Sequence, residues 1–219
     1  MELTKEMQEF LGRMSLRNRL NRIARLKDLN ACAAPGGIAF IGDSIVENFP
    51  TDELLRDYPV FNRGFSGDTT AEMLSRLDYT VFSLRPAHVY ALIGTNDLGQ
   101  KKDQKEILQN LKALHTKIRG SLPECRVHLL SVLPVNPEDK KSHPEYAYMA
   151  AGRENGEIVR LNAAYSDLAA EFGWEFVDVY GGMCDERGFL KAAYTVEGLH
   201  LTVAGYMRLT ELLRPYLGR

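Results

Sequence analysis

Apolar and polar positions follow two different patterns along this chain, one typical of strands and one typical of helices. Short apolar runs rich in β-branched and aromatic residues are typical of buried strands. Between them lie longer segments whose apolar residues return every three to four positions, which is the spacing of an amphipathic helix. The strands expected are Ile38–Ile41, a segment near Pro59–Asn62, Val89–Ile93, Val127–Leu133 and Phe176–Val179, and the helices expected are 69–84, 104–119, 155–172 and 203–217.

This alternation predicts one α/β domain over residues 35–219, with a parallel sheet covered by helices on both faces. In such folds the loops that follow the strands converge at one edge of the sheet, where ligands bind. No internal repeat, low-complexity tract or linker in the sequence marks a second domain within this range. The chemistry of the chain is therefore expected at the carboxyl ends of the strands.

Apolar residues also recur at helical spacing over residues 1–34. This apolar stripe shifts its phase near Ser15, a residue suited to cap a second helix. Over residues 1–30 there are seven Lys and Arg against four Asp and Glu, a local charge of +3. We interpret residues 1–34 as a helical extension that packs on the domain with its arginines in solvent. The alternative is a helix that binds a membrane surface or another subunit, so a homodimer stays open.

Composition narrows the class of protein further. Apolar residues make up 45% of the chain and charged residues 26%, and the net charge of −2 gives no reason to expect nucleic acid or an anionic membrane as a partner. The longest apolar runs are far too short to cross a bilayer, and the acidic start does not resemble a secretory signal. Three cysteines without a CxxC spacing predict free thiols in a reducing compartment, so we expect a cytoplasmic protein.

Ser44 lies just beyond the first predicted strand. Gly42, two residues earlier, permits a tight turn that presents the hydroxyl at the edge of the sheet, and a helix that begins there places backbone N–H groups near a developing negative charge. Taken alone, Ser44 is also a common helix N-cap. Ser66 is a weaker competing nucleophile, because the esterase elbow needs glycine two places after the serine and Asp68 stands there.

Two loops and one late turn carry further groups suited to acyl transfer. Gly67 leaves its backbone N–H unshielded by a side chain, and the Asn96 amide can donate to an oxyanion without adding a competing charge. Glu197 and His200 lie three residues apart before the last predicted helix, so the carboxylate can reach the imidazole and set its tautomer. Taken alone, the two loops also have an explanation as a turn or a helix cap, and a lone histidine is usually structural or solvated.

Taken in order, these segments resemble the GDSL or SGNH hydrolases. The match consists of GDS, then N-x-G-x-x-G-D-T, then G-T-N-D, then G-L-H-L-T before a terminal helix, and it runs from about Ile38 to Leu217. Within the family the chain is most similar to bacterial esterases that resemble brain-type platelet-activating-factor acetylhydrolase, notably through G-D-T-T at 67–70. The resemblance implies a three-layer α/β/α sandwich with a flavodoxin-like, five-stranded parallel sheet.

The resemblance also implies a role for individual residues. Ser44 corresponds to the nucleophile and the first oxyanion donor, Gly67 to the second donor, Asn96 to the third and His200 to the general base. These roles define an acyl transfer to water through a covalent intermediate on the serine.

One position departs from the family pattern. The family usually has aspartate three residues before the histidine, and this chain has Glu197, which is longer by one methylene. A Ser–His–Glu triad and a Ser–His dyad therefore both stay open. Asp178, at the end of the last predicted strand, is a reserve candidate for the acid.

The long segment Leu133–Gly156 follows the fourth predicted strand and contains three prolines. Long loops in compact domains are commonly functional, so a substrate-covering loop and a variable surface insertion are both open. The residues considered for substrate binding are Asp43, Asn136, Tyr146, Tyr148 and Arg153.

The sequence therefore predicts a serine esterase that hydrolyses a small-molecule acyl ester. No cofactor is expected, and no metal either, because the sequence holds neither HExxH nor a Cys/His pairing. An acetyl group is favoured, because nothing resembles a hydrophobic lid for long acyl chains. The alternatives are a carbohydrate O-acetylesterase, a lysophospholipase or thioesterase, and, from another class, a catalytically weak binding module on the same fold.

Overall fold

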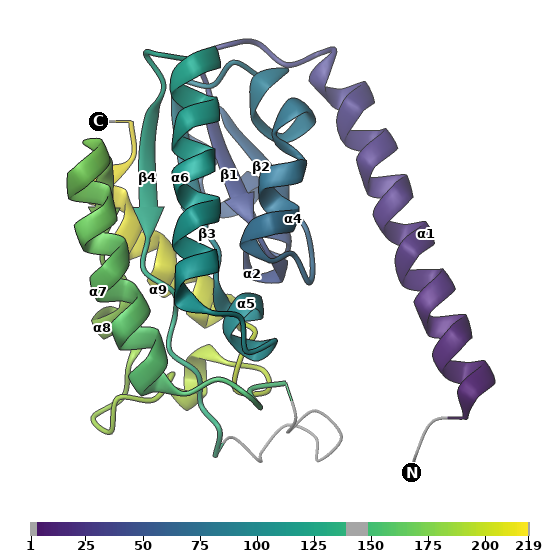
Figure 1. The fold of residues 1–219 in the computed structure, drawn as a ribbon, viewed down its shortest axis with the longest axis vertical. Helices are drawn as coiled ribbons and strands as arrows, with labels where there is room; N and C mark the ends of the chain where they lie inside the picture. Colours follow the sequence, from purple (N-terminus) through teal and green to yellow (C-terminus); the bar gives the residue numbers. More distant parts are fainter. Residues whose placement is uncertain (1–3, 139–148, 219) are drawn as a thin grey trace. The chain divides into compact units, whose positions relative to one another are not determined.

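The structure is a computed structural model that describes residues 4–138 and 149–218 (Figure 1). It divides the chain into two compact units, Met1–Ala34 and Pro35–Arg219, and each is described here by itself. The second unit holds a parallel sheet with helices on both sides, so the predicted α/β class is confirmed. Within the described ranges, no helix combines the length and the apolar character that a membrane span requires.

The first unit is a helix, α1 (Lys5–Asn30), whose N-terminus is capped by the Thr4 hydroxyl. The predicted break at Ser15 is wrong, because good helix formers on both sides of this serine carry the helix through the phase shift. Packing of α1 on the domain or on a second copy stays a prediction. Its exposed large apolar side chains are Met7, Phe10, Leu11, Met14, Leu16, Leu20 and Leu29.

The sheet of the second unit has the strand order β2-β1-β3-β4-β5, and all neighbouring strands are parallel. This is the flavodoxin-like order, with a switch point where β2 and β3 lie on opposite sides of β1. Gly42 pairs with Gly64 on one side and Leu92 on the other, so the three following loops leave the sheet at one edge. The strands are β1 (Ile38–Gly42), β2 (Val60–Gly64), β3 (His88–Leu92), β4 (Arg126–Leu130) and β5 (Glu175–Val177).

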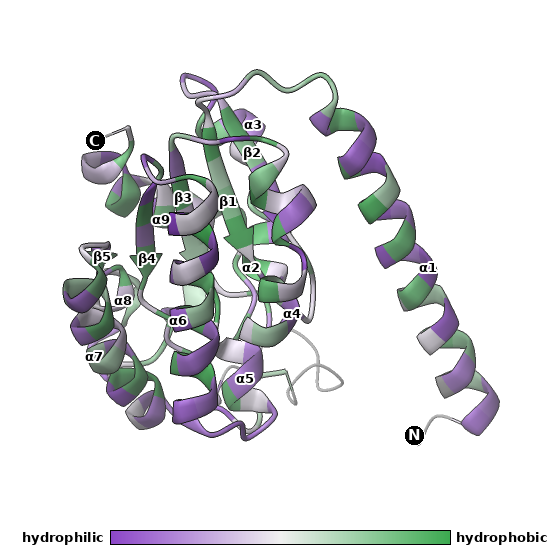
Figure 2. Ribbon diagram, turned by 45° about the horizontal axis from the view of Figure 1, so that its top comes forward, coloured by the Kyte–Doolittle hydropathy of each residue, from purple (hydrophilic) through white to green (hydrophobic). Residues whose placement is uncertain are grey.

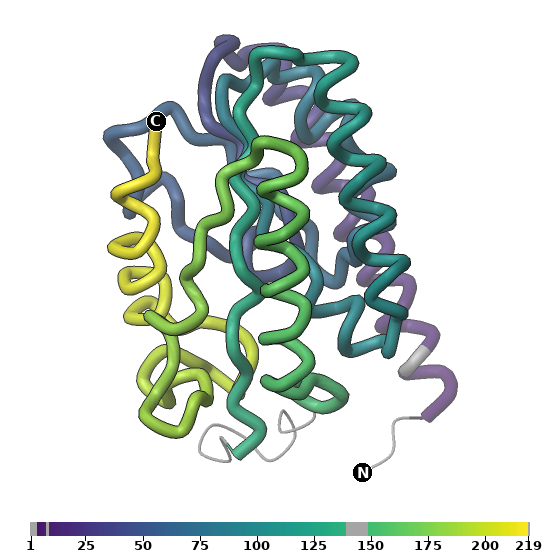
Figure 3. Tube along the Cα trace, turned by 60° about the vertical axis from the view of Figure 1, so that its left-hand side comes forward, coloured from purple at the N-terminus to yellow at the C-terminus, as the bar shows by residue number. Residues whose placement is uncertain are grey.

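Helices cover both faces of this sheet. The strands β4 and β5 run between α7 and α9, which are green and yellow in Figure 3. Helix α6 carries hydrophobic residues on one side and hydrophilic residues on the other, as its two colours in Figure 2 show, and Ile107, Leu111, Leu114 and Ile118 on the hydrophobic side are buried. One face of the sheet carries α4 (Thr70–Ser75), α6 (Gln104–Ser121) and α7 (Asn155–Phe172). The other face carries α2 (Ser44–Glu47), α8 (Tyr180–Met183) and α9 (Val203–Leu213). The remaining short helical elements are α3 (Thr51–Leu54), α5 (Thr95–Gly99), η3 (Ala192–Tyr194) and η4 (Arg214–Tyr216).

The structure departs from the expected elements at two places where side chains bond to the backbone. The helix expected over 69–84 ends at Ser75 and is followed by a π-helical turn, η1 (Asp78–Phe82), and here the Thr80 hydroxyl donates to a backbone carbonyl. The strand expected to reach Leu133 ends at Leu130, because the Asn162 side chain bonds both backbone groups of Val132. The short helices α2, α3, α5 and α8 hold too few residues to show a helical period.

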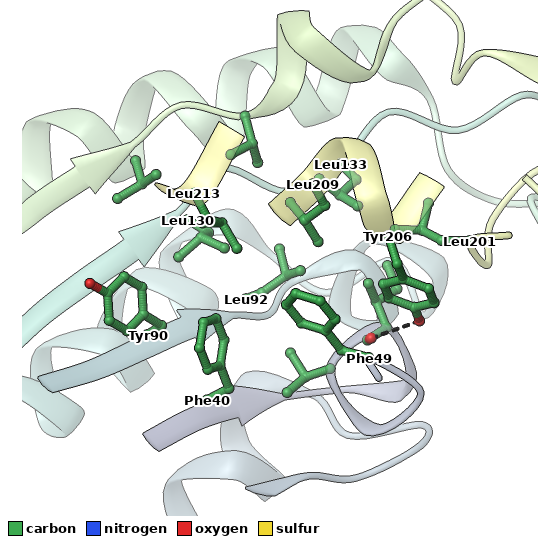
Figure 4. Close-up of a cluster of buried hydrophobic side chains, with 14 of the residues drawn as sticks. Phe40, Phe49, Tyr90, Leu92, Leu130, Leu133, Leu201, Tyr206, Leu209 and Leu213 are labelled. Carbon is green, nitrogen blue, oxygen red and sulfur yellow. Dashed lines mark hydrogen bonds between the residues drawn. The ribbon is translucent and has the colours of Figure 1, made fainter. Parts of the chain in front are cut away.

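An aromatic cluster in the core joins distant parts of the chain (Figure 4). Phe40 stacks on Tyr90 with ring centroids 5.0 Å apart and meets Phe49 edge-on at 5.6 Å. Phe49 stacks in turn on Tyr206 at 5.3 Å. The Tyr206 hydroxyl donates to the Ile45 carbonyl at 2.8 Å, the hydrogen bond drawn beside Tyr206 in Figure 4. Helix α9 is thereby fixed against α2.

We predict that Tyr206→Phe lowers the free energy of unfolding by about 1–3 kcal/mol, because the buried Ile45 carbonyl loses its donor while the ring stays in place. Urea unfolding followed by circular dichroism measures the change. The matched control is Tyr216→Phe, at a partly exposed tyrosine near the end of the chain. An equal loss in the control would show that the hydrogen bond to Ile45 does not stabilise the fold.

Candidate active site

Ser44 is the first residue of α2, directly after β1. A Cβ at Gly42 would overlap the Leu92 carbonyl, so the turn from strand to helix requires glycine at this position. The N-cap of the helix is Asp43, whose Oδ1 accepts the Ile45 N–H at 2.9 Å. The capping role that competes with catalysis for Ser44 is therefore taken by its neighbour.

His200 lies against Ser44 although 156 residues separate them, with Nε2 2.9 Å from Oγ. On the other side of the ring, Nδ1 is 2.5 Å from Oε1 of Glu197, which also accepts the backbone N–H of His200 at 2.9 Å. The Glu197 side chain is only 6% exposed, so the carboxylate is shielded from water. With Nδ1–H held by the carboxylate, Nε2 presents its lone pair to the serine hydroxyl.

A tight turn brings Glu197 and His200 together. The Thr195 hydroxyl donates to the His200 carbonyl at 2.9 Å and accepts the Gly198 N–H at 2.8 Å. The Val196 N–H donates to the same His200 carbonyl at 2.9 Å. These bonds close the turn and hold the imidazole at a distance that suits the longer glutamate side chain.

The reserve acid Asp178 has a different environment. It is exposed after β5, accepts the Tyr180 N–H at 3.0 Å and lines a separate cavity. The histidine nitrogen that it would have to hold is already in contact with Glu197. Glu197 is therefore the acid that the geometry offers to His200.

One cleft of about 570 Å³ is lined by Ser44, Gly67, Asn96 and His200 together. Among the described residues, the backbone N–H groups of Ser44 and Gly67 donate to no other protein group. Gly67 has φ of 82°, a left-handed conformation that glycine adopts without strain. Asn96 donates one Nδ2 hydrogen to the Asp68 carbonyl at 3.0 Å, which leaves its second hydrogen for a ligand. The cleft thus offers three N–H donors beside the Ser44 hydroxyl.

The loop that carries Gly67 is tied to α2. The Asn62 amide donates to the carbonyls of Val46 at 2.6 Å and Phe49 at 3.0 Å. The Ser66 N–H donates to Oε2 of Glu47 at 2.5 Å. These bonds explain the asparagine of the N-x-G motif as a support for the site. Ser66 also lines the cleft, but the imidazole of the site contacts the other serine.

The residues considered for substrate binding are placed differently from one another. Asp43 and Asn136 are buried, at 1% and 4% exposure, and neither is among the described residues that line the cleft. Tyr146 and Tyr148 lie outside the described residues. Arg153 does line the cleft. It lies near the end of the long segment Leu133–Gly156, for which the sequence leaves a substrate-covering loop and a surface insertion open.

Three residues that line the cleft were missed by the sequence reasoning. Asn48 lies four positions after Ser44, and Leu199 immediately precedes His200, so spacing from the motifs points to both. Met149 lies in the long segment, where no pattern distinguishes it.

Buried ionisable side chains surround Ser44. Burial raises the pKa of Asp43 to about 7, while the Ile45 N–H and the positive charge of Arg153 act in the opposite direction. Burial also raises the pKa of Asp97, against two hydrogen bonds from the Thr70 hydroxyl at 2.6 Å and the Thr70 N–H at 3.0 Å. Burial lowers the pKa of Arg153, and Asp43 opposes this shift. Arg153 is therefore the cation that balances the acid behind Ser44.

The fold and the contact of Ser44 with His200 define an SGNH-type hydrolase. The chain belongs to the GDSL-like Lipase/Acylhydrolase family, whose model matches residues 40–208, and the resemblance inferred from the sequence is confirmed. Members of this family hydrolyse ester bonds, and this chain is an enzyme of that kind. Among residues 4–138 and 149–218, no group of three or more His, Cys, Asp or Glu is arranged to hold a metal ion.

Three relatives illustrate the family. A solved structure from Streptococcus pneumoniae, provisionally named a platelet activating factor, has a TM-score of 0.88 and 34% identity, with 98% of this chain and 100% of that chain covered. The rat platelet-activating factor acetylhydrolase IB subunit alpha2 is 24% identical over 80% of this chain and 73% of its own length. The human isoamyl acetate-hydrolyzing esterase 1 homolog is 28% identical over 70% of this chain and 66% of its own length.

We predict that the stability difference between the wild type and Asp43→Asn depends on pH. Because burial raises the pKa of Asp43 from 3.8 to about 7, the folded protein keeps a proton that the unfolded chain loses in this range. The contribution of Asp43 to stability is therefore complete below about pH 4 and is lost as the pH rises through about 7. Urea unfolding at several pH values between about 5 and 8 measures this difference.

The matched control is Asp103→Asn, at an exposed aspartate that also caps a helix by accepting a backbone N–H. Its stability difference from the wild type should stay constant over the same pH range. If the Asp43→Asn difference is equally constant, or if the wild type gains stability over the variant as the pH rises, Asp43 does not hold a proton in the folded protein.

Proposed function

We propose that this protein hydrolyses short-chain esters, acetyl esters above all, through an acyl-enzyme on Ser44 with His200 as general base. The observation that carries the proposal is the continuous contact from Glu197 through His200 to Ser44, at the edge of a cleft lined by three N–H donors. This arrangement supplies a nucleophile, a base, an acid that orients the base and a site for a negative oxygen.

In the first half of the reaction, Oγ of Ser44 attacks the ester carbonyl carbon while Nε2 of His200 takes its proton. The carbonyl oxygen becomes an oxyanion, which the N–H groups of Ser44 and Gly67 and the Nδ2 of Asn96 stabilise. Glu197 stabilises the imidazolium that forms. The tetrahedral intermediate then collapses, His200 gives its proton to the departing alkoxide, and the alcohol leaves.

In the second half, a water molecule attacks the acyl-enzyme while His200 takes one of its protons. The second tetrahedral intermediate uses the same three donors. When it collapses, the bond to Oγ breaks, His200 returns the proton to Ser44, and the carboxylic acid leaves. The enzyme ends the cycle in its starting state, and the net reaction is ester plus water to acid plus alcohol.

The preference for a small acyl group is supported by the lining of the cleft. Met149 and Leu199 are the two large apolar side chains among its described residues, so the described lining holds no extended row of apolar side chains for a long acyl chain. Two of the relatives carry names that refer to acetyl esters, an acetylhydrolase and an isoamyl acetate-hydrolyzing esterase. Both observations favour acetyl over long-chain esters.

We predict that Ser44→Ala lowers kcat for p-nitrophenyl acetate by about 10³-fold or more, because the acyl-enzyme cannot form. Steady-state kinetics and labelling by a fluorophosphonate probe measure the loss, while Ser66→Ala should still be labelled. In the wild type, kcat/KM should fall from acetyl to butyryl to octanoyl esters. Activity that survives in Ser44→Ala would refute the nucleophile, and a preference for octanoyl esters would refute the acetyl assignment.

We predict that Glu197→Gln lowers kcat by about 10³–10⁴-fold, because the amide keeps the size of the side chain but removes the charge that fixes and stabilises the imidazolium. Glu175→Gln is the matched control, since Glu175 likewise contacts a histidine, His128, at 2.9 Å but lies outside the described lining of the cleft. Its turnover should stay at the wild-type level. A loss of only a few-fold in Glu197→Gln would favour a Ser–His dyad over a triad.

A further inference from the structure

We infer that Arg153 is a positioning residue that fixes the orientation of the Asn96 amide and so presents the third oxyanion donor. This inference rests on the proposed function. Arg153 precedes α7 and lies 57 residues along the chain from Asn96, outside every motif of the family pattern. The sequence alone suggested it only as a substrate-binding residue.

Five hydrogen bonds hold the Arg153 guanidinium. Nε donates to the carbonyl of Thr95 at 2.9 Å and to its hydroxyl at 3.0 Å. Nη1 donates to the carbonyls of Met149 at 2.8 Å and Ala151 at 3.2 Å. Nη2 donates to Oδ1 of Asn96 at 3.1 Å. The side chain thus joins the long segment before α7 to the start of α5.

These bonds leave the guanidinium poorly suited to bind an anionic substrate. An arginine has five N–H hydrogens, and the contacts above engage the one on Nε, both on Nη1 and one on Nη2. A bidentate grip on a carboxylate or phosphate needs two parallel N–H groups. Arg153 has one hydrogen left, so its main contact with the reaction runs through Asn96.

The contact decides which end of the Asn96 amide faces the cleft. An amide side chain has similar shape in two orientations related by a half-turn, and only its NH₂ end can donate to an oxyanion. In the observed orientation Oδ1 accepts from Arg153 and Nδ2 donates to the Asp68 carbonyl. The half-turn would place the NH₂ against a cationic donor and the oxygen against a carbonyl. Both contacts would then be repulsive, so Arg153 and Asp68 select the same orientation.

The surroundings hold the guanidinium at this place. Asp43 attracts it, and a Cβ on Gly99 would overlap its Nη2 and Cζ atoms, so the guanidinium lies directly against the backbone of α5. A charged, delocalised donor is also stronger than a neutral one. The same positive charge lies in the wall of the cleft where the oxyanion forms.

The test is a double-mutant cycle between Arg153→Met and Asn96→Ala, measured on p-nitrophenyl acetate with wild-type turnover first shown to require Ser44. We expect Arg153→Met to lower kcat by about 10–100-fold with KM within about 2-fold, because one transition-state donor is weakened. In the Asn96→Ala background, Arg153→Met should cause a much smaller loss than in the wild type, limited to the effect of removing its positive charge from the wall of the cleft. Arg153→Lys should also lose turnover, since an ammonium cannot hold Thr95 and Asn96 together.

Two further variants separate positioning from structure. Arg160→Met, at an exposed arginine of α7, is the matched control and should keep wild-type kinetics. Gly99→Ala displaces the guanidinium while the arginine remains, and it should lower kcat in the same sense as Arg153→Met. It also provides the test if Arg153→Met does not fold, as judged by circular dichroism.

Two results would overturn the inference. Losses that multiply in the double variant would mean that Arg153 acts independently of Asn96. A rise in KM with unchanged kcat would make Arg153 a substrate-binding residue. Absence of Ser44-dependent turnover in the wild type is a different outcome, which refutes the proposed function itself and is therefore distinguishable from a failure of the positioning role.

Discussion

The contact between α2 and α9 is the constraint on which the site depends. Ser44 begins one of these helices and His200 lies shortly before the other, so their contact at 2.9 Å requires the two helices to keep one relative position. Tyr206 provides it, through its stacking on Phe49 and its hydrogen bond to the Ile45 carbonyl. Because hydrogen bonds weaken steeply with small changes in distance and angle, the contact between His200 and Ser44 depends on this buried aromatic cluster.

A second constraint is electrostatic. The proposed reaction at Ser44 creates a negative oxygen on the substrate carbonyl, yet the acidic side chains of Asp43, Asp68 and Asp97 are all buried close by. Each of them holds backbone or side-chain partners that build the site: Asp43 caps α2, Asp68 pairs with Arg76 at 3.1 Å, and Asp97 joins α5 to α4. Such a concentration of acids would disfavour an oxyanion unless cations balance it. The position of Arg153 serves this balance and the orientation of the amide at once.

The sequence predicted the strands, the two long helices of one face and the motif residues because these depend on local periodicity and on residues at the ends of strands. It left a helix N-cap open as the alternative role of Ser44, whereas Asp43 makes the capping bond, because serine and aspartate are equally good caps and only geometry separates them. It could not predict the contact of Arg153 with Asn96, since that contact joins a residue of α5 to one 57 positions later in the chain and has no periodic signature. Long-range polar contacts of this kind follow from the complete fold rather than from any segment of it.

Polar contacts between distant segments also explain why glutamate fits at position 197, where the family usually has aspartate. The extra methylene changes where the carboxylate lies relative to the backbone, so the turn must hold the ring at a matching distance. Thr195 closes that turn from within, and the backbone N–H of Asn136 donates to the Gly198 carbonyl at 2.8 Å from outside it. Asn136, which the sequence suggested for substrate binding, thus supports the turn through its backbone and lies buried behind it. The turn that carries the acid is therefore supported by the segment after β4 as well as by its own residues.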